Sequence, residues 1–140
     1  PWFIVDAAPA QARLIRTARE VNDSKPHHVV AQVRAAAGKE AVVACLGLSF
    51  KANVDDLRES PAVEIATHLV DAGLKVLAVE PHVTALPKAL QGRVELVSLA
   101  DALARASVVV LLVDHRAFAS LTLEQLKGKK LIDTRGVIRS

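Results

Sequence analysis

The first part of the chain has the apolar periodicity of a helix. Between residues 9 and 37, apolar side chains recur every three or four positions, which is the spacing of one face of an α-helix. The pattern keeps its phase across Pro26, which favours one long helix kinked there; the alternative ends one helix at Asn22-Asp23 and begins another at Ser24. A single helix of this length extends beyond a small domain, so we expect it to connect domains or to pack against a second subunit. Its apolar stripe consists of Leu14, Ala18, Val21, Val29, Val33 and Ala36.

After Gly38, short and continuous apolar runs alternate with helical patterns. Runs of this kind are typical of strands in a parallel sheet that is covered on both faces. The predicted strands are Ala41–Leu48, Lys75–Glu80, Val94–Val97, Ser107–Val113 and Leu131–Asp133. The predicted helical segments are Ala62–Ala72, residues 84–90, Leu99–Ala104 and the single turn Leu123–Leu126.

Right-handed crossovers make 3-2-1-4-5 the expected order of these five strands. The sequence therefore predicts an α/β fold, a Rossmann-like parallel sheet with helices on both faces, preceded by the long helix. Residues 1–38 would form an opening segment and the connecting or dimerisation helix, and residues 39–140 the Rossmann-like domain.

The carboxyl ends of parallel strands meet at one edge of a sheet, and ligands bind in the crevice where the strand order reverses. Here that crevice would lie between the first and fourth strands, and Lys51 and Arg135 are the two cations on loops close to it. Lys51 follows Phe50, so a phosphate could meet the ammonium while the ring stacks on a base or a sugar. The alternative, an ordinary surface lysine, stays open from the residues alone. The segments expected at this edge are Ser49-Phe50-Lys51, Pro81-His82, Asp114-His115 and Thr134-Arg135.

Composition narrows the class of protein. The 140 residues are 51% hydrophobic and 24% charged, which excludes a disordered chain, and no apolar run is long enough to span a bilayer. A net charge of +3 with 3% aromatic residues argues against a nucleic-acid surface. The single cysteine cannot form an internal disulfide, so a cytoplasmic location is expected. Because the sequence opens on Pro1 and contains no methionine, we expect it to be a piece of a longer protein.

Several residues are of types that often serve in catalysis or cofactor binding, but their positions in this sequence argue against such a role. The loop after the first strand has Gly47 but no second glycine, so it lacks the fingerprint of a dinucleotide site, and Glu80 is interpreted as a solvated strand end. Cys45 lies within a strand and is expected to be an inert core residue. The histidines show no metal-ligand spacing, so no metal site is predicted, and His27 and His28 are interpreted as surface or interface residues.

The charged part of the loop contains Asp55, Asp56, Arg58 and Glu59. The acids could act as general acids or bases, but beside an arginine they more often form an ion-pair cluster that stabilises a loop. For Arg58 the structural and the binding interpretation both stay open. Ser60-Pro61 then provides an N-cap and a first helical residue for the next helix.

The run Gly-Leu-Ser-Phe-Lys-Ala-Asn-Val-Asp-Asp-Leu-Arg-Glu-Ser-Pro-Ala over residues 47–62 resembles the UDP-binding domain of the UDP-glucose/GDP-mannose dehydrogenase family. The likeness extends to the helical segment over residues 11–23, to residues 112–115 and to residues 133–137, which resemble the family's bacterial UDP-N-acetyl-D-mannosamine dehydrogenases. It thus covers almost the whole chain.

The resemblance implies an NAD-dependent parent enzyme that oxidises the C6 alcohol of a UDP-sugar to a carboxylate in two hydride transfers, for cell-surface polysaccharide synthesis. Phe50, Lys51 and Arg135 would contact the UDP-sugar, and Arg58 would reach toward NAD held by another domain. The family's nucleophilic cysteine lies in a segment upstream of this chain, so no catalytic residue is assigned here, and the chain alone should be inactive. A homodimer through the long helix is also implied. The alternative is a stand-alone Rossmann-like nucleotide-binding or regulatory module.

Overall fold

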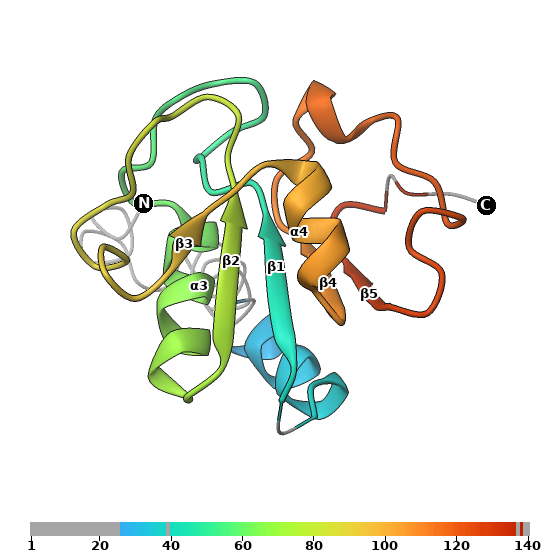
Figure 1. Cartoon of the computed structure of the whole chain (residues 1–140). Coiled ribbons are helices and arrows are strands. Elements are labelled where there is room, and N and C mark those ends of the chain that lie inside the picture. The colour runs from blue at the N-terminus through green and yellow to red at the C-terminus, as the bar shows by residue number, and fades with distance from the viewer. Residues whose placement is uncertain (1–25, 39, 137, 139–140) are drawn as a thin grey trace, which may run out of the picture.

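The computed structural model describes residues 26–38, 40–136 and 138, and its centre is a parallel sheet of five strands (Figure 1). The order is β3-β2-β1-β4-β5, which confirms the predicted topology. β1 pairs in register with β2 on one side and with β4 on the other, so it is the central strand. The strands are β1 Val42–Leu46, β2 Lys75–Val79, β3 Glu95–Leu96, β4 Val108–Leu111 and β5 Lys130–Asp133.

Helices cover both faces of the sheet, as the sequence predicts. Successive side chains of a strand point to opposite faces, and the core is divided accordingly. On one face, Val43 and Cys45 of β1 pack in a cluster with α3 (Pro61–Asp71) and with a helix over residues 26–36. On the other, Ala44 and Leu46 pack with α4 (Leu99–Arg105) and the 3₁₀ turn η1 (Arg116–Phe118).

The helix over residues 26–36 is the described part of the predicted long helix. Val29 and Val33, two members of the predicted stripe, are buried in the core cluster beneath α3, whereas His27 and His28 are exposed as expected. The preceding part of the predicted helix, and the choice between one kinked helix and two, lie outside the described residues. None of the helices in the described ranges is long and apolar enough to cross a membrane.

Several predicted elements differ from the structure in extent or in kind, two of them for a clear physical reason. Residues 84–90 do not form a helix but a series of turns, in which the amides of Leu90 and Gln91 both donate to the carbonyl of Pro87. A proline in mid-segment removes a helical donor, which the apolar spacing alone does not reveal. The fourth strand is shorter than predicted, because the amides of Leu112 and Val113 both donate to the Leu46 carbonyl and the ladder ends there.

Gly47 makes the turn out of the central strand. Its φ is +91°, a conformation that costs other residues energy, and a Cβ placed there would lie 2.6 Å from the Cβ of Val113. Its amide donates to the carbonyl of Val79. The chain therefore leaves β1 by passing close to the loop that follows β4, and only glycine fits.

We expect Gly47→Ala to destabilise the fold more than Gly73→Ala does. Gly73 has nearly the same φ, +87°, but open space where its Cβ would be, so both variants bear the conformational cost and only the first bears the clash. Overpacking of this kind typically adds about 1–3 kcal/mol. Urea unfolding of both variants measures the difference. Equal losses would show that the contact with Val113 is relieved by a small shift.

Candidate functional site

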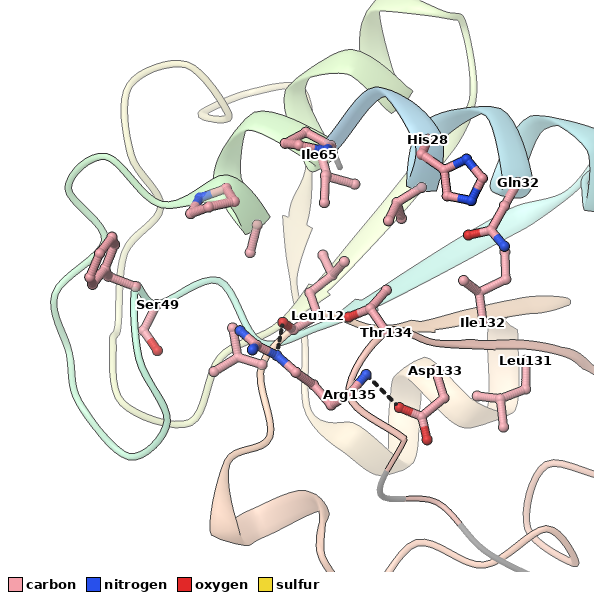
Figure 2. Close-up of a pocket in the computed structure, with 16 residues that line it drawn as sticks. His28, Gln32, Ser49, Ile65, Leu112, Leu131, Ile132, Asp133, Thr134 and Arg135 are labelled. Carbon is pink, nitrogen blue, oxygen red and sulfur yellow. Dashed lines mark hydrogen bonds between the residues drawn. The ribbon is translucent and has the colours of Figure 1, made fainter. Parts of the chain in front are cut away.

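A cavity of about 730 Å³ opens at the carboxyl edge of the sheet, between the helix over residues 26–36, the start of α3 and the end of β5 (Figure 2). Its size is that of a small-molecule site. The described residues that line it are Pro26, His28, Val29, Gln32, Ser49, Phe50, Pro61, Ala62, Ile65, Leu112, Val113, Leu131, Ile132, Asp133, Thr134 and Arg135. The loops after β1, β4 and β5 thus converge on it.

The structure brings two of the predicted substrate-binding residues to this cavity. Phe50 lines it from the loop after β1 with 47% of its surface exposed, and Arg135 lines it from the loop after β5. Lys51 is also exposed, but it does not belong to the residues that line the cavity. Arg58 lies later in the same loop, also outside the cavity lining.

The position of Arg135 is fixed by its backbone and by one side-chain nitrogen. Its amide donates to Oδ1 of Asp133 (2.9 Å), and its Nε donates to the carbonyl of Leu112 (3.1 Å), as Figure 2 shows. The nearest carboxylate, Asp114 Oδ1, is 4.0 Å from Nε. Within the described ranges neither terminal nitrogen of the guanidinium has a hydrogen-bond partner, so both can bind an anion bidentately.

Asp133 is the one carboxylate among the lining residues, and backbone amides occupy its oxygens. Oδ1 accepts from the amides of Arg135 and Gly136, and Oδ2 accepts from the amide of Ile138 at 2.8 Å. The carboxylate therefore shapes the loop after β5 and is already engaged by donors. Both of its oxygens accept hydrogen bonds from backbone amides of that loop and none from the guanidinium of Arg135.

The start of α3 forms another wall. Ser60 is its N-cap: the side-chain oxygen accepts from the amide of Ala62 (3.2 Å) and donates to the carbonyl of Leu48 (2.6 Å). The hydroxyl thus ties the helix start to the loop after β1. Pro61 and Ala62 face the cavity, so the positive end of the helix dipole is close to it.

Glu80 is not the solvated strand end that the sequence suggested; only 3% of its surface is exposed. It follows β2, and its Oε2 accepts from the amides of Leu48 (2.7 Å) and Ser49 (3.1 Å). The same oxygen lies 2.8 Å from Nε2 of the buried His115, and Oε1 accepts from the amide of His82. A buried carboxylate is stable only when it is paired and hydrogen-bonded, and these contacts provide both conditions.

His115 connects Glu80 to the loop after β1. The amide of Asn53 donates to Nδ1 of the ring (2.8 Å), so Nδ1 is the acceptor, and Nε2 carries the proton directed at Glu80. Asn53 has a φ of +60°, and its side-chain oxygen accepts from the amide of Arg116. Two loops that are about sixty residues apart along the sequence are therefore joined by reciprocal hydrogen bonds.

Sequence reasoning placed His115 at this edge of the sheet but missed the buried Glu80 and the contact between the two side chains. The available signal was their placement: Glu80 directly follows β2 and His115 lies in the loop after β4, both strands pair with β1, and strand ends on one sheet edge must meet. The polarity of Glu80 suggested solvent exposure instead.

Arg58 forms an ion pair with Asp56, one of the three acids that the sequence analysis expected to cluster with it. Nε and Nη2 of the guanidinium donate to the two carboxylate oxygens at 3.0 and 3.2 Å. This hydrogen bonding lowers the pKa of Asp56 below its usual value and raises that of Arg58. The arginine side chain is nevertheless 90% exposed, so it stays accessible to another molecule or domain.

Cys45 is a core residue, as predicted. It is fully buried within β1, and burial raises the pKa of its thiol to about 12. A thiol of this kind is not a nucleophile at neutral pH.

Two groups of three side chains in the described ranges have possible metal-ligand atoms within 4.8 Å of one another. The first group is Glu80, His82 and His115, in which the glutamate and His115 are already engaged in the loop network. The second group is His27, Glu64 and His68, and no member of it lines the cavity.

A family model matches residues 44–140 of the chain, and it describes the UDP binding domain of the UDP-glucose/GDP-mannose dehydrogenase family. The chain belongs to this family. This confirms the resemblance that residues 47–62 carry, and it makes the cavity beside Phe50 and Arg135 part of a UDP-binding domain.

Curated relatives extend the likeness to the whole chain. The NDP-N-acetyl-D-galactosaminuronic acid dehydrogenase of Ralstonia nicotianae is 61% identical over 98% of the chain and 33% of its own length. The UDP-N-acetyl-D-mannosamine dehydrogenase of Salmonella typhi is 49% identical over 99% of the chain and 36% of its own length. The chain therefore spans about a third of the length of these relatives.

A solved structure supports the same family. The UDP-N-acetyl-mannosamine dehydrogenase of S. aureus superposes with a TM-score of 0.77 at 35% identity, over the whole chain and 33% of that protein. The chain thus corresponds to the C-terminal, UDP-binding domain of the family's dehydrogenases.

We expect Glu80→Ala to lower the free energy of unfolding of the domain by at least about 3 kcal/mol. The substitution leaves three buried donors without their acceptor, those of Leu48, Ser49 and His115, and each unsatisfied donor typically costs about 1–3 kcal/mol. Urea unfolding measures the loss. Glu95→Ala, which removes an exposed glutamate paired with Arg105, is the control and should cost much less. Equal losses would mean that water replaces the carboxylate without penalty.

Proposed function

We propose that the chain is the UDP-sugar-binding part of an NAD-dependent UDP-sugar 6-dehydrogenase. The proposed substrate is a UDP-linked N-acetylhexosamine, with UDP-N-acetyl-D-mannosamine as the candidate sugar. The observation that supports this most directly is Arg135, whose guanidinium lies at a cavity of nucleotide size in a domain of a UDP-binding family. The names of the Salmonella typhi and Ralstonia nicotianae relatives both specify N-acetylated sugars.

The cavity offers one partner for each part of a uridine nucleotide. Arg135 and the amino end of α3 provide positive charge for the diphosphate. Phe50 provides an exposed aromatic ring on which a base or a sugar can stack. Apolar side chains of α3 and β5, among them Ile65 and Ile132, complete the walls.

Lys51 is proposed as an additional contact at the outer side of the site. It is adjacent to Phe50 and exposed, and a lysine acts on phosphate as a flexible point charge. Its effect on binding should therefore be smaller than that of Arg135, whose guanidinium is held by the carbonyl of Leu112.

Arg58 is proposed to contact NAD bound by another domain. It does not line the cavity, and it remains exposed while its ion pair with Asp56 holds it against the loop. In this proposal residues 1–38 connect the two domains and form a homodimer interface, and residues 39–140 bind the UDP-sugar. The nucleophilic cysteine would come from the parent enzyme outside this chain, because Cys45 is buried in the core.

The second candidate function is a stand-alone nucleotide-binding or regulatory module. It needs the same cavity but no partner domain. Arg58 separates the two functions, because a contact between its guanidinium and NAD requires a second domain that binds the dinucleotide.

We expect Arg135→Ala to weaken UDP binding by about tenfold, measured by calorimetry. A hydrogen bond to a charged group is typically worth about 1.5–3 kcal/mol, and the side chain is partly exposed, so the lower end applies. Lys51→Ala should weaken UDP binding by a smaller factor and Arg58→Ala should leave it nearly unchanged. Arg93→Ala, which removes an exposed arginine paired with Asp71, is the matched control. Equal effects of all four variants would contradict the assignment.

The chain should bind UDP and UDP-N-acetyl-D-mannosamine but hardly any NAD. The loop after β1 has Gly47 alone, and its next two amides are already bound to the Glu80 carboxylate, so no pyrophosphate cradle exists there. Titration with the three ligands under the same buffer conditions measures this. NAD binding that is tighter than UDP binding would reverse the assignment of the domain.

A further inference from the structure

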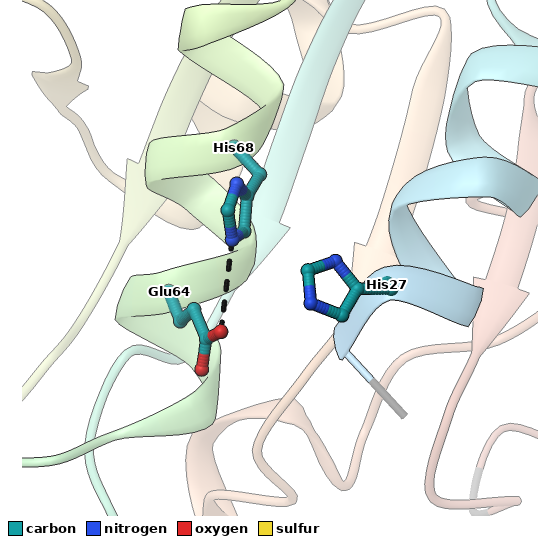
Figure 3. Close-up of side chains that lie close together, drawn as sticks. All are labelled: His27, Glu64 and His68. Atoms are coloured by element: carbon teal, nitrogen blue, oxygen red, sulfur yellow. Dashed lines mark ion pairs between the residues drawn. The ribbon is translucent and has the colours of Figure 1, made fainter. Parts of the chain in front are cut away.

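We propose that His27, Glu64 and His68 form a zinc site that joins the helix over residues 26–36 to α3. Figure 3 shows the three side chains directed toward one another from the two helices. The proposal does not depend on the nucleotide site, since none of the three residues lines the cavity.

The two residues of α3 are already close to the required geometry. Glu64 and His68 are four positions apart, so they lie one above the other on the same face of the helix, and Oε1 is 3.6 Å from Nε2. Four-residue spacing is the arrangement in which a helix presents two ligands to one metal ion. In the described part of the chain, the only ion pair of Glu64 is the one with His68, so no lysine or arginine occupies the carboxylate.

His27 provides the third ligand from the facing helix. Its ring centroid lies 5.2 Å from that of His68, and the rings are tilted by 46°, so the pair is not stacked face to face. The possible ligand atoms of all three residues lie within 4.8 Å of one another. Zinc bonds of about 2.0–2.1 Å in a tetrahedron place ligand atoms about 3.3 Å apart, so rotation of exposed side chains is sufficient to close the site.

The chemical types of the three ligands indicate which metal ion the site would bind. Two imidazoles and one carboxylate suit zinc, with water in the fourth position, whereas magnesium and calcium prefer oxygen ligands alone. The site is on the surface, where the ligands are accessible without unfolding. Because its ligands come from two helices, bound zinc should stabilise the docked position of the helix over residues 26–36.

The experiment is a calorimetric titration of the untagged, chelator-treated chain with zinc chloride. Wild type should bind one zinc ion per chain, and His27→Gln and His68→Gln should each weaken binding by at least about tenfold, as expected for loss of a metal ligand. Glu64→Gln should also weaken it. His28→Gln is the matched control: it removes the neighbouring exposed histidine of the same helix, which faces the cavity, and should leave zinc affinity unchanged.

A second readout separates ligation from folding. Zinc should raise the melting temperature of wild type and of His28→Gln, reversibly with EDTA, and should raise that of His68→Gln by less at the same zinc concentration. The proposal is overturned by an absence of saturable zinc binding in the wild type, or by an equal loss of affinity in His28→Gln. It is also overturned if His82→Gln abolishes binding, because zinc would then bind beside Glu80 and His115.

Discussion

The buried carboxylate of Glu80 is the constraint on which the carboxyl edge of the sheet depends. It accepts hydrogen bonds from the amides of Leu48 and Ser49 and from the ring of His115, so one anion fixes the turn out of β1 and the loop after β4 together. Through His115 the same anion orients the amide of Asn53 at the far end of the long loop. These contacts hold the loop in place, and the Ser60 hydroxyl, which donates to the carbonyl of Leu48, connects it to the start of α3.

The same contacts argue against the use of the usual dinucleotide position in this Rossmann-like domain. In a dinucleotide site, the amides after the first strand face a pyrophosphate, and glycines allow that approach. Here the protein's own carboxylate occupies those amides, and Gly47 serves a different need, the close passage of the chain past Val113. A phosphate at this position would have to displace a buried anion. The proposed site for an anion is the neighbouring cavity, where Arg135 and the amino end of α3 would provide the charge.

The sequence predicts what depends on local pattern. The strand order, the two covered faces, the Ser60 cap and the burial of Cys45 follow from apolar runs and capping residues. It fails where a residue's environment is made by distant segments. Glu80 looks solvated because its partners are about thirty residues away in sequence, and residues 84–90 look helical because their spacing outweighs the effect of Pro87. The grouping of His27 with α3 is hidden for the same reason, since helix packing alone brings it there.

The helix over residues 26–36 has a role beyond covering the sheet. Val29 and Val33 fix it in the core, while the same helix contributes one wall of the nucleotide cavity and His27 of the proposed metal site. Ligands that contact both this helix and the rest of the domain bind only when the helix is docked. By linkage, each such ligand favours the docked state and so strengthens the binding of the other, without any contact between them.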